Sequence, residues 1–515
     1  MMTIAQDPKT FTNADTARKS RPHAIVIGAG FGGLAAAVRL TARGYRVTIV
    51  EALEQIGGRA SVYRQDGFTF DAGPTIITAP FVFEELWTLH GENMHDHLDL
   101  RAMEPFYAIR YQEDGKVFRA WSDPQKTAEE IAKFDPGDVA GYWRFLEESE
   151  RCFKTGFLGM IDKPYHTIGR MAAAMPGLIA RRAERSIHAL VSKYIKNERL
   201  RQCLSFHPLF IGGNPLRTSG VMALIAHLEK TYGVHYAMGG TGALVKAIAA
   251  LAERTGTTIH VNTPVDEIIV ENGKATGVRL ASGEHIHGDC VVSNADTATT
   301  YQHLLKRHPR KRWTDRRLDR MWYSMSLFVW HFGTNRTYPD VDHHTILMGP
   351  RYEELLRDIF RHRKLADDFS LYLYRPSATD PSVAPEGCDS FYVLSPVPNL
   401  DGETDWETAA EAYRARIEAC LEQTILPNLS EHIVTSKLVT PITFRDRFRS
   451  KKGAAFGMEP VIWQLAWFRP HNISEEVKDL YIVGAGTHPG AGLPGVVSSA
   501  KILDKLVPHA SAVTR

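Results

Sequence analysis

The chain has 515 residues, of which 44% are hydrophobic and 23% charged, and its formal net charge is +2. This composition excludes a disordered chain and predicts a folded protein of about two to four domains or subdomains. The balanced charge, without a basic stripe interleaved with aromatic residues, argues against a nucleic-acid partner.

The N-terminal 22 residues are polar and lack the apolar core of a signal peptide, so we expect a flexible tail on a cytoplasmic protein. No stretch of about 18 apolar residues predicts a membrane-spanning helix, although peripheral membrane contact stays open. The cysteines form no CxxC pair and indicate reduced thiols rather than a zinc site or disulfides. They are Cys152, Cys203, Cys290, Cys388 and Cys420.

The first motif is a predicted strand–helix–strand unit over residues 23–52. The apolar run "HAIVIGAG" (23–30), the helical pattern "LAAAVRLTARG" (34–44) and the β-branched "YRVTIVEA" (45–52) predict strand, helix and strand of a parallel sheet. The turn carries Gly28, Gly30 and Gly33 in GxGxxG spacing. These glycines permit a tight turn, close approach of a pyrophosphate and helix–strand packing, respectively.

Glu51 ends the second predicted strand, where a carboxylate can bind ribose hydroxyls. In the following "EQIGGRASVY" (54–63), Gly58 and Arg59 add flexible backbone and a cation beside the expected pyrophosphate. This favours FAD over NAD, because a flavin extends further along the protein. The next stretch, "GFTFDAGPTIIT" (67–78), predicts a strand entering a constrained turn at Gly73 and Pro74 that lines the flavin ring.

A second αβ block comprises a predicted helix (239–256) and short strands (257–296). Within it, Val265 is expected to offer main-chain groups to an adenine, or to belong to a plain sheet strand. A last strand (479–486) and helix (495–507) close the chain.

We therefore predict an α/β and α+β protein with a Rossmann-like FAD-binding domain assembled from discontinuous segments and an inserted mixed sheet/helix substrate domain. The expected FAD-binding segments are 23–90, 231–299 and 451–515. Residues 91–230 are expected to be helical and to include a membrane-facing part, and residues 300–450 to form the mixed part.

The C-terminal stretch "YIVGAGTHPGAGLPGVVSSA" (481–500) surrounds a second helix start with glycines and prolines. A helix N-terminus beside the flavin can stabilise the negative charge of the reduced ring. The residues expected there are Gly484, Gly486, Gly495 and Val496. His488 either touches the flavin or is a packed turn residue, and both alternatives stay open.

No Ser-His-Asp set, paired carboxylates or HExxH motif is present. The adjacent His343 and His344 are expected to point apart on a strand, so no metal site is predicted. We therefore expect the cofactor, rather than a side chain, to carry out the redox reaction.

In this order and spacing, the motifs resemble the carotenoid desaturases of the bacterial and fungal phytoene desaturase type, within the amine-oxidase-like flavoprotein superfamily. The stretches "FHPLFIGGNP" (206–215), "YAMGGTGALVKA" (236–247) and "AWFRPHN" (466–472) look like that family too. The resemblance covers nearly the whole chain after residue 22. It implies an FAD enzyme that desaturates phytoene stepwise toward neurosporene or lycopene, with Gly28, Gly30, Gly33, Glu51, Arg59 and Val265 around the FAD.

A lipophilic C40 substrate implies work at a membrane surface, with oxygen or a quinone taking the electrons. Residues 167–195 include Arg170, Arg181, Arg182 and Arg185 among apolar residues, which is typical of a surface-bound amphipathic helix but also of a solvated helical face. The alternatives are another carotenoid desaturase or isomerase (for example of hydroxyneurosporene type), an amine oxidase, or a non-enzymatic flavoprotein that binds prenylated partners.

Overall fold

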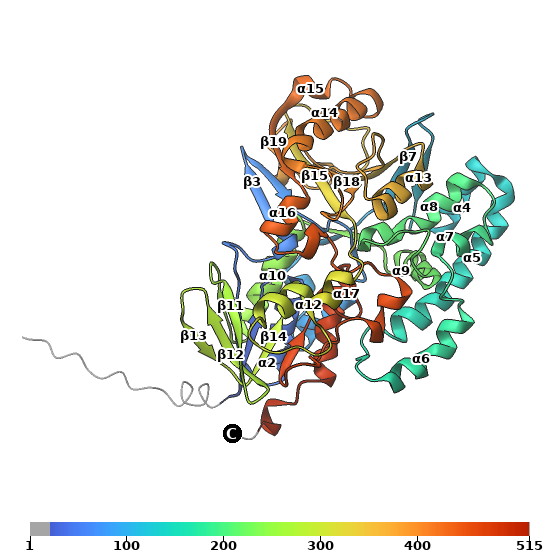
Figure 1. The fold of residues 1–515 in the computed structure, drawn as a ribbon. Coiled ribbons are helices and arrows are strands. Elements are labelled where there is room, and N and C mark those ends of the chain that lie inside the picture. Colours follow the sequence, from blue (N-terminus) through green and yellow to red (C-terminus); the bar gives the residue numbers. More distant parts are fainter. Residues whose placement is uncertain (1–20, 514–515) are drawn as a thin grey trace, which may run out of the picture.

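The structure, a computed structural model, describes residues 21–513 (Figure 1). All but the last two residues of the predicted tail (1–22) lie outside the described residues.

A five-stranded sheet of parallel strands organises the lower part of the molecule (Figure 1). Its order is β10-β2-β1-β14-β20, with neighbours paired in parallel. These strands are β1 (His23–Ile27), β2 (Arg46–Val50), β10 (Thr257–His260), β14 (Cys290–Ser293) and β20 (Leu480–Ile482). They come from three separated parts of the chain, which confirms the prediction of a Rossmann-like fold assembled from discontinuous segments.

Helices cover this sheet because its strands are apolar on both faces. The helix α2 (Phe31–Ala42) follows β1 and packs against both α10 (Thr241–Arg254) and α17 (Leu493–Lys501). Small residues make this contact close: Ala35, Ala36 and Ala37 are completely buried. The C-terminal helix therefore lies beside the N-terminal one.

A seven-stranded sheet forms the upper part, in the order β19-β15-β18-β17-β16-β7-β8. Its strands are β7 (Tyr107–Tyr111), β8 (Val117–Ala120), β15 (Ser326–Thr334), β16 (His344–Met348), β17 (Leu371–Tyr374), β18 (Asp389–Val397) and β19 (Ile433–Val439). The amphipathic α14 (Trp406–Thr424) packs on one face, where its Tyr413, Ile417 and Leu421 join the aromatic residues of β15. The sequence predicted a mixed sheet and helix part over residues 300–450, and the structure adds β7 and β8 from outside that range.

The segment 91–230 differs in part from the helical expectation. Its helices are α4 (Pro124–Phe134), α5 (Val139–Cys152), α6 (Ile168–Ala180), α7 (Ile187–Ser192), α8 (Glu198–Ser205) and α9 (Leu224–Tyr232). Residues 100–120 instead form β6 (Leu100–Ala102), β7 and β8. The aromatic and β-branched runs "FYAIRY" and "KVFRA", joined by a turn, favour a hairpin over a helix. The predicted domain bounds stay a prediction.

Smaller sheets and helices link the two large sheets. The strands are β3 (Val62–Gln65), β4 (Phe68–Asp71), β5 (Ile77–Thr78), β9 (Val234–Ala237), β11 (Val265–Glu271), β12 (Lys274–Leu280) and β13 (His285–His287). The helices are α3 (Phe81–Thr88), α11 (Thr297–Thr299), α12 (Asp315–Arg320), α13 (Tyr352–Arg357), α15 (Leu429–His432) and α16 (Pro441–Asp446).

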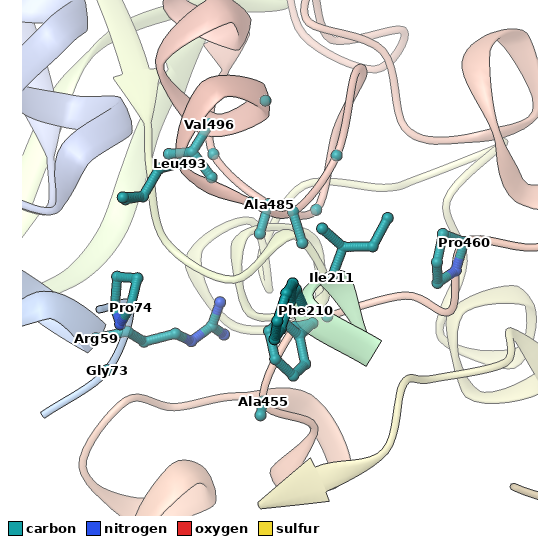
Figure 2. A pocket seen from close by; sticks show the side chains of 18 of the residues that line it. Arg59, Gly73, Pro74, Phe210, Ile211, Ala455, Pro460, Ala485, Leu493 and Val496 are labelled. Atoms are coloured by element: carbon teal, nitrogen blue, oxygen red, sulfur yellow. The ribbon is translucent and has the colours of Figure 1, made fainter. Parts of the chain in front are cut away.

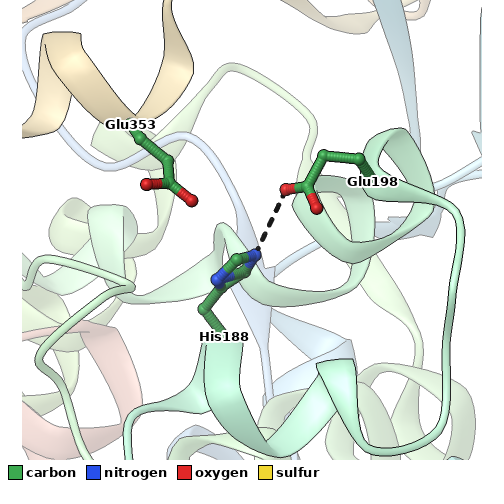
Figure 3. A group of neighbouring side chains, drawn as sticks. All are labelled: His188, Glu198 and Glu353. Atoms are coloured by element: carbon green, nitrogen blue, oxygen red, sulfur yellow. Dashed lines mark ion pairs between the residues drawn. The ribbon is translucent and has the colours of Figure 1, made fainter.

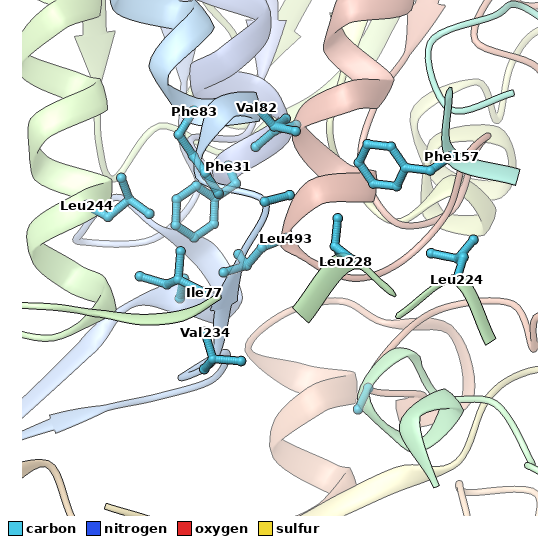
Figure 4. Close-up of a cluster of buried hydrophobic side chains, with 14 of the residues drawn as sticks. Phe31, Ile77, Val82, Phe83, Phe157, Leu224, Leu228, Val234, Leu244 and Leu493 are labelled. Carbon is cyan, nitrogen blue, oxygen red and sulfur yellow. The ribbon is translucent and has the colours of Figure 1, made fainter. Parts of the chain in front are cut away.

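One hydrophobic core joins the five-stranded sheet and its helices to residues 91–230, called here the helical segment. Phe31 of α2, Ile77 of β5 and Leu493 of α17 meet beside Leu228 of α9 (Figure 4). Burial of this apolar surface fixes the helical segment against the two helix starts. Among residues 21–513, no helix combines the length and apolar character that crossing a bilayer requires.

Candidate cofactor and substrate site

A cavity of about 640 Å³, called here the central cavity, is lined by residues of both large sheets and of the helical segment. Figure 2 shows some of the lining side chains. All the site residues predicted from the sequence line it, except Gly33. They are Gly28, Gly30, Glu51, Gly58, Arg59, Gly73, Pro74, Val265, Gly484, Gly486, His488, Gly495 and Val496. Residues that lie more than 450 positions apart in sequence thus surround one space.

Gly33 lies behind the lining. A Cβ atom at this position would lie 1.9 Å from the carbonyl oxygen of Gly28, so only glycine permits α2 to pack this closely. Gly32, which the sequence reading did not single out, faces the cavity instead.

The start of α2 offers unpaired donors to the cavity. Its N-cap residue Gly30 makes no side-chain capping bond, so main-chain N–H groups of the first turn and the positive end of the helix dipole stay available to an anion. Beside it, Glu51 accepts the N–H of Ala29 at 2.7 Å and that of Leu53 at 2.9 Å. A carboxylate fixed in this way fits the polar ribose end of a dinucleotide.

The GGR segment and the "FDAGPT" turn contact one another, although the sequence treats them as separate motifs. A Cβ on Gly73 would lie 2.1 Å from the carbonyl oxygen of Arg59. The Arg59 side chain extends into the cavity (Figure 2) and donates from Nη2 to Ser450 Oγ at 2.6 Å. Burial lowers the pKa of Arg59, and the charge of Asp296 partly offsets this effect. The cavity therefore holds a cation beside the glycine turns.

Asn294 joins the two glycine-rich turns. A Cβ on Gly32 would lie 2.4 Å from Asn294 Oδ1, and one on Gly484 would lie 2.7 Å from the same atom. The sequence analysis placed this residue among the short strands of 257–296 and did not predict it as a site residue. The signal was present, because a polar residue directly after a buried parallel strand faces the ligand edge of the sheet.

Glycines of the C-terminal stretch 484–495 also pack closely against neighbouring atoms. A Cβ on Gly486 would lie 2.0 Å from Thr297 Oγ1, and one on Gly495 would lie 2.8 Å from the Gly490 carbonyl oxygen. The loop ends at the N-cap residue Gly492, with φ of +94° and no side-chain capping bond. A second uncapped helix start, that of α17, thus faces the same cavity as that of α2.

His488 is a packed turn residue. Its Nε2 donates to the carbonyl of Met160 at 2.9 Å, and its ring lies edge-on to Tyr165 at 4.8 Å between centroids. Burial lowers its pKa to about 4, so the ring is neutral at physiological pH. His488 also lines the cavity, and its contact with a flavin stays a prediction.

Arg469 is a site residue that the sequence reading missed. It lines the cavity, is 1% exposed and donates from Nη2 to the Met458 carbonyl at 2.8 Å, while its Nε has no partner. Burial alone lowers its pKa to about 10, since no described carboxylate offsets the loss of hydration. Burying a cation without a carboxylate partner among residues 21–513 is costly, and a negative ligand in the cavity would offset that cost. Arg469 lies in the motif "AWFRPHN", which the sequence analysis used only for the family resemblance.

Asp71 fixes the "FDAGPT" turn to the start of α10. Its carboxylate accepts the N–H of Gly242 at 3.2 Å and the hydroxyl of Tyr374 at 3.1 Å. Burial raises its pKa to about 6 despite these bonds. An acid whose pKa is raised by folding contributes most to stability below its unfolded pKa of 3.8, and this contribution is lost as the pH rises to about 6.

The variant Asp71→Asn is therefore expected to flatten the pH dependence of stability between about pH 4 and 6. A shift of about two units corresponds to about 3 kcal/mol across that window. Thermal unfolding at several pH values, compared with wild type, measures the effect. An equal slope in both proteins would show that Asp71 does not titrate in this range.

The expectation that His343 and His344 point apart is wrong. His343 precedes β16 and His344 begins it, and their rings do not point apart but meet edge-to-face at 4.5 Å between centroids. The residue before a strand is free of the strand's alternation, so both rings enter one buried aromatic cluster with Tyr374. Burial lowers the pKa of both groups.

Within residues 21–513, one cluster has the make-up of a metal site: His188, Glu198 and Glu353 (Figure 3). However, Glu198 pairs with Arg201 at 3.0 Å and Glu353 pairs with Arg357 at 2.7 Å. Because each carboxylate already has a cationic partner, ion pairing accounts for the cluster.

Most of the remaining cavity lining is apolar. Phe210 and Ile211 project into its centre from the segment His207–Ile211 (Figure 2). Further apolar side chains come from α9 and from strands β15 to β18: Leu224, Ile225, Leu228, Leu327, Ile346, Leu371 and Leu394. A polar cradle at one side and an apolar wall at the other fit a cofactor with charged phosphates and a hydrocarbon-like ligand.

Comparisons with known proteins agree with this arrangement. The family model of flavin-containing amine oxidoreductases matches residues 31–502. A neurosporene-forming phytoene desaturase of Cereibacter sphaeroides is 49% identical over 96% of both chains. A lycopene-forming phytoene desaturase of Pseudescherichia vulneris is 46% identical over 94% of this chain and 98% of its own.

An oxidoreductase of Methanosarcina mazei shares the fold, with a TM-score of 0.64 and 17% identity over 94% of this chain and all of that one. The resemblance inferred from the motifs is thereby confirmed. The chain belongs to the flavin-containing amine oxidoreductases and, within them, to the family of the bacterial phytoene desaturases.

Proposed function

We propose that this protein is an FAD-dependent desaturase that converts phytoene stepwise toward neurosporene or lycopene. The observation that carries the proposal is the central cavity, which joins a cradle for a charged dinucleotide to an apolar wall. The identity of 46–49% to phytoene desaturases over almost the whole chain supports it.

We assign the polar side of the cavity to FAD. Gly28, Gly30 and the start of α2 would hold the pyrophosphate, with Arg59 as a counter-cation, and Glu51 would hold the ribose. Val265 would lie at the adenine. Gly58, Gly73 and Pro74 would flank the cofactor from one side.

Gly484, Gly486, Gly495 and Val496 would flank the cofactor from the other side, where the start of α17 and Arg469 add positive charge. When bound, FAD supplies the hydride acceptor that no side chain can provide.

The apolar side would bind the hydrocarbon. A polyene without polar groups is held by burial of its surface alone, and the lining residues exclude water from the reacting carbons. Phe210 projects between the two sides, where it would hold the substrate against the cofactor.

The test uses the purified protein with FAD and phytoene-loaded liposomes, followed by absorption spectra and chromatography. New visible bands of a conjugated polyene are expected, and their positions count the steps. Colour from another carotenoid precursor but not from phytoene would point to a hydroxyneurosporene-type desaturase or an isomerase. Flavin reduction by an amine would point to an amine oxidase, and FAD binding without any turnover to a non-enzymatic binding protein.

We also propose oxygen or a membrane quinone as electron acceptor, since two electrons leave the substrate with each new double bond. Turnover under anaerobic conditions, with and without a quinone in the liposomes, separates the two. Turnover that continues without either would require a different acceptor.

We propose further that the protein is peripheral on the cytoplasmic membrane and that α6 contacts the lipid. No residue of this helix is buried, and Ile168 and Ile179 are 71% and 65% exposed. The same helix lines the central cavity with Met171 and Leu178. Arg170, Arg182 and Arg185 are exposed nearby and would meet anionic headgroups. Substrate leaving the lipid would thus reach the cavity beside α6.

The double variant Ile168→Glu/Ile179→Glu is expected to lose most of its binding to anionic liposomes, because two charges replace the inserted side chains. Flotation assays measure the bound fraction. The matched control is Val434→Glu, which alters an apolar residue of β19 that is 50% exposed and should bind as wild type. Equal binding by all three proteins would remove α6 from the proposed contact.

A further inference from the structure

Among the acidic residues that line the central cavity, Glu229 of α9 is the one that the proposed function does not assign to the cofactor or to its counter-cation. The others are Glu51 and Asp296. Both oxygens of Glu51 accept main-chain N–H groups. Asp296 accepts those of Ala298 and Thr299 and faces Arg59. Glu229 lies on the helical segment instead, away from the glycine turns.

Only one oxygen of Glu229 is engaged. The Tyr107 hydroxyl donates to Oε2 at 3.0 Å, and His207 Nε2 lies 3.4 Å from the same oxygen. The other oxygen, Oε1, is buried without a hydrogen-bond partner among the described residues, and the side chain as a whole is about 5% exposed. A buried acceptor without a partner is costly, which is a reason to seek a function for it.

The surroundings fix this carboxylate in place. The hydroxyl oxygen of Tyr107 lies 2.9 Å from His207 Nε2. Because the Tyr107 hydroxyl donates its hydrogen to Glu229, His207 Nε2 is the donor to Tyr107. Burial raises the pKa of Tyr107 well above its usual value, so the phenol remains a donor. Phe206 stacks on His207 at 4.5 Å and holds the ring. The carboxylate thus has one fixed oxygen and one free oxygen.

The helix that carries Glu229 lies beside the expected flavin end of the cavity. Leu228, the preceding residue, and Leu493 at the start of α17 belong to one buried cluster (Figure 4), and both line the central cavity. The short strand β5 contacts both helices. Glu229 and Leu493 line the same cavity, in which the proposed function places the reacting carbons.

Desaturation removes two hydrogens from adjacent carbons. One leaves as hydride, with both electrons of its C–H bond, to the FAD that the proposed function supplies. The other leaves as a proton, and the electron pair of its C–H bond becomes the second bond between the two carbons. An apolar cavity without water needs an acceptor for that proton.

We propose that Glu229 is the catalytic base of the reaction and that its Oε1 accepts this proton. Tyr107 and His207 are positioning residues, which hold Oε2 so that Oε1 faces the substrate. The inference rests on the proposed function and names the residue that completes it.

The test compares Glu229→Gln with wild type, because the amide oxygen still accepts from Tyr107 while the group facing the cavity is no longer basic. With FAD and phytoene-loaded liposomes, polyene formation per bound FAD is expected to fall by about 10²–10⁴-fold, while FAD content and melting temperature stay as in wild type. The matched control is Glu130→Gln, a buried carboxylate of α4 that pairs with Lys133 and lies outside the cavity lining.

Two further variants separate chemistry from structure. Glu229→Asp is expected to retain part of the activity, and Glu229→Ala to recover part of it when formate is added. Activity per bound FAD that equals wild type in Glu229→Gln would overturn the proposal. A loss of activity that only follows the loss of FAD, without recovery by formate, would overturn it too. If the wild-type protein forms no conjugated product, the proposed function fails and this inference falls with it.

Discussion

Replacing Gly33 by alanine is expected to give a protein that binds no FAD and unfolds at a clearly lower temperature. The added Cβ would lie 1.9 Å from the carbonyl oxygen of Gly28 and 3.2 Å from its carbonyl carbon. Backbone cannot rotate away as a side chain can, so α2 must shift from β1. Overpacking costs about 1–3 kcal/mol in ordinary cores, and a backbone clash should exceed that.

The shift of α2 would also move the helix start that faces the cavity. FAD content after purification and the melting temperature with and without added FAD measure the two effects. The matched control is Gly169→Ala in α6, where the new Cβ would meet nothing within 4 Å. A Gly33→Ala protein with normal FAD content and stability would mean that α2 tolerates displacement and that its position does not govern cofactor binding.

Gly33 illustrates what a sequence pattern can predict. The GxGxxG spacing predicted a tight turn at Gly28, a pyrophosphate contact at Gly30 and helix–strand packing at Gly33. In the structure Gly28 and Gly30 line the central cavity and Gly33 packs behind it, while their contact with FAD stays a prediction. The pattern works because each glycine answers a local backbone requirement that the sequence itself encodes. The parallel sheet followed from short apolar strands in the same way.

Asn294 and Arg469 lie in stretches with a local signal, but their contacts, like those of Glu229, were not predicted, for a different reason. Each depends on which distant segment lies opposite: Asn294 meets Gly32 and Gly484, and Glu229 meets Tyr107. Periodicity and turn chemistry describe neighbours along the chain, whereas these contacts arise from tertiary packing. The hairpin at 100–120 was missed for a related reason, since short aromatic runs fit either a buried helix or a strand until their partners are known.

Replacing Arg469 by methionine is expected to weaken FAD binding by about 10- to 100-fold without destabilising the apoprotein. A hydrogen bond to a buried charged group contributes about 1.5–3 kcal/mol, which corresponds to that loss of affinity. The stability of the apoprotein is expected to change in the opposite direction. A lowering of the pKa from 12.5 to about 10 means that folding costs about 3 kcal/mol to bury this cation. Methionine removes that cost but leaves the Met458 carbonyl without its donor.

The matched control is Arg39→Met. Arg39 is as deeply buried but pairs with Glu85 at 3.0 Å and Asp504 at 2.6 Å, away from the cavity lining. Its loss should lower the stability of the apoprotein and leave FAD affinity unchanged, the reverse of Arg469→Met. Titration of apoprotein with FAD and thermal unfolding of both forms measure the two quantities. If Arg469→Met instead destabilises the apoprotein and binds FAD normally, the buried guanidinium supports the fold rather than the cofactor. The retention of Arg469 without a carboxylate partner among residues 21–513, at a cost to folding, is otherwise explained by the negative charge that FAD would bring to the cavity.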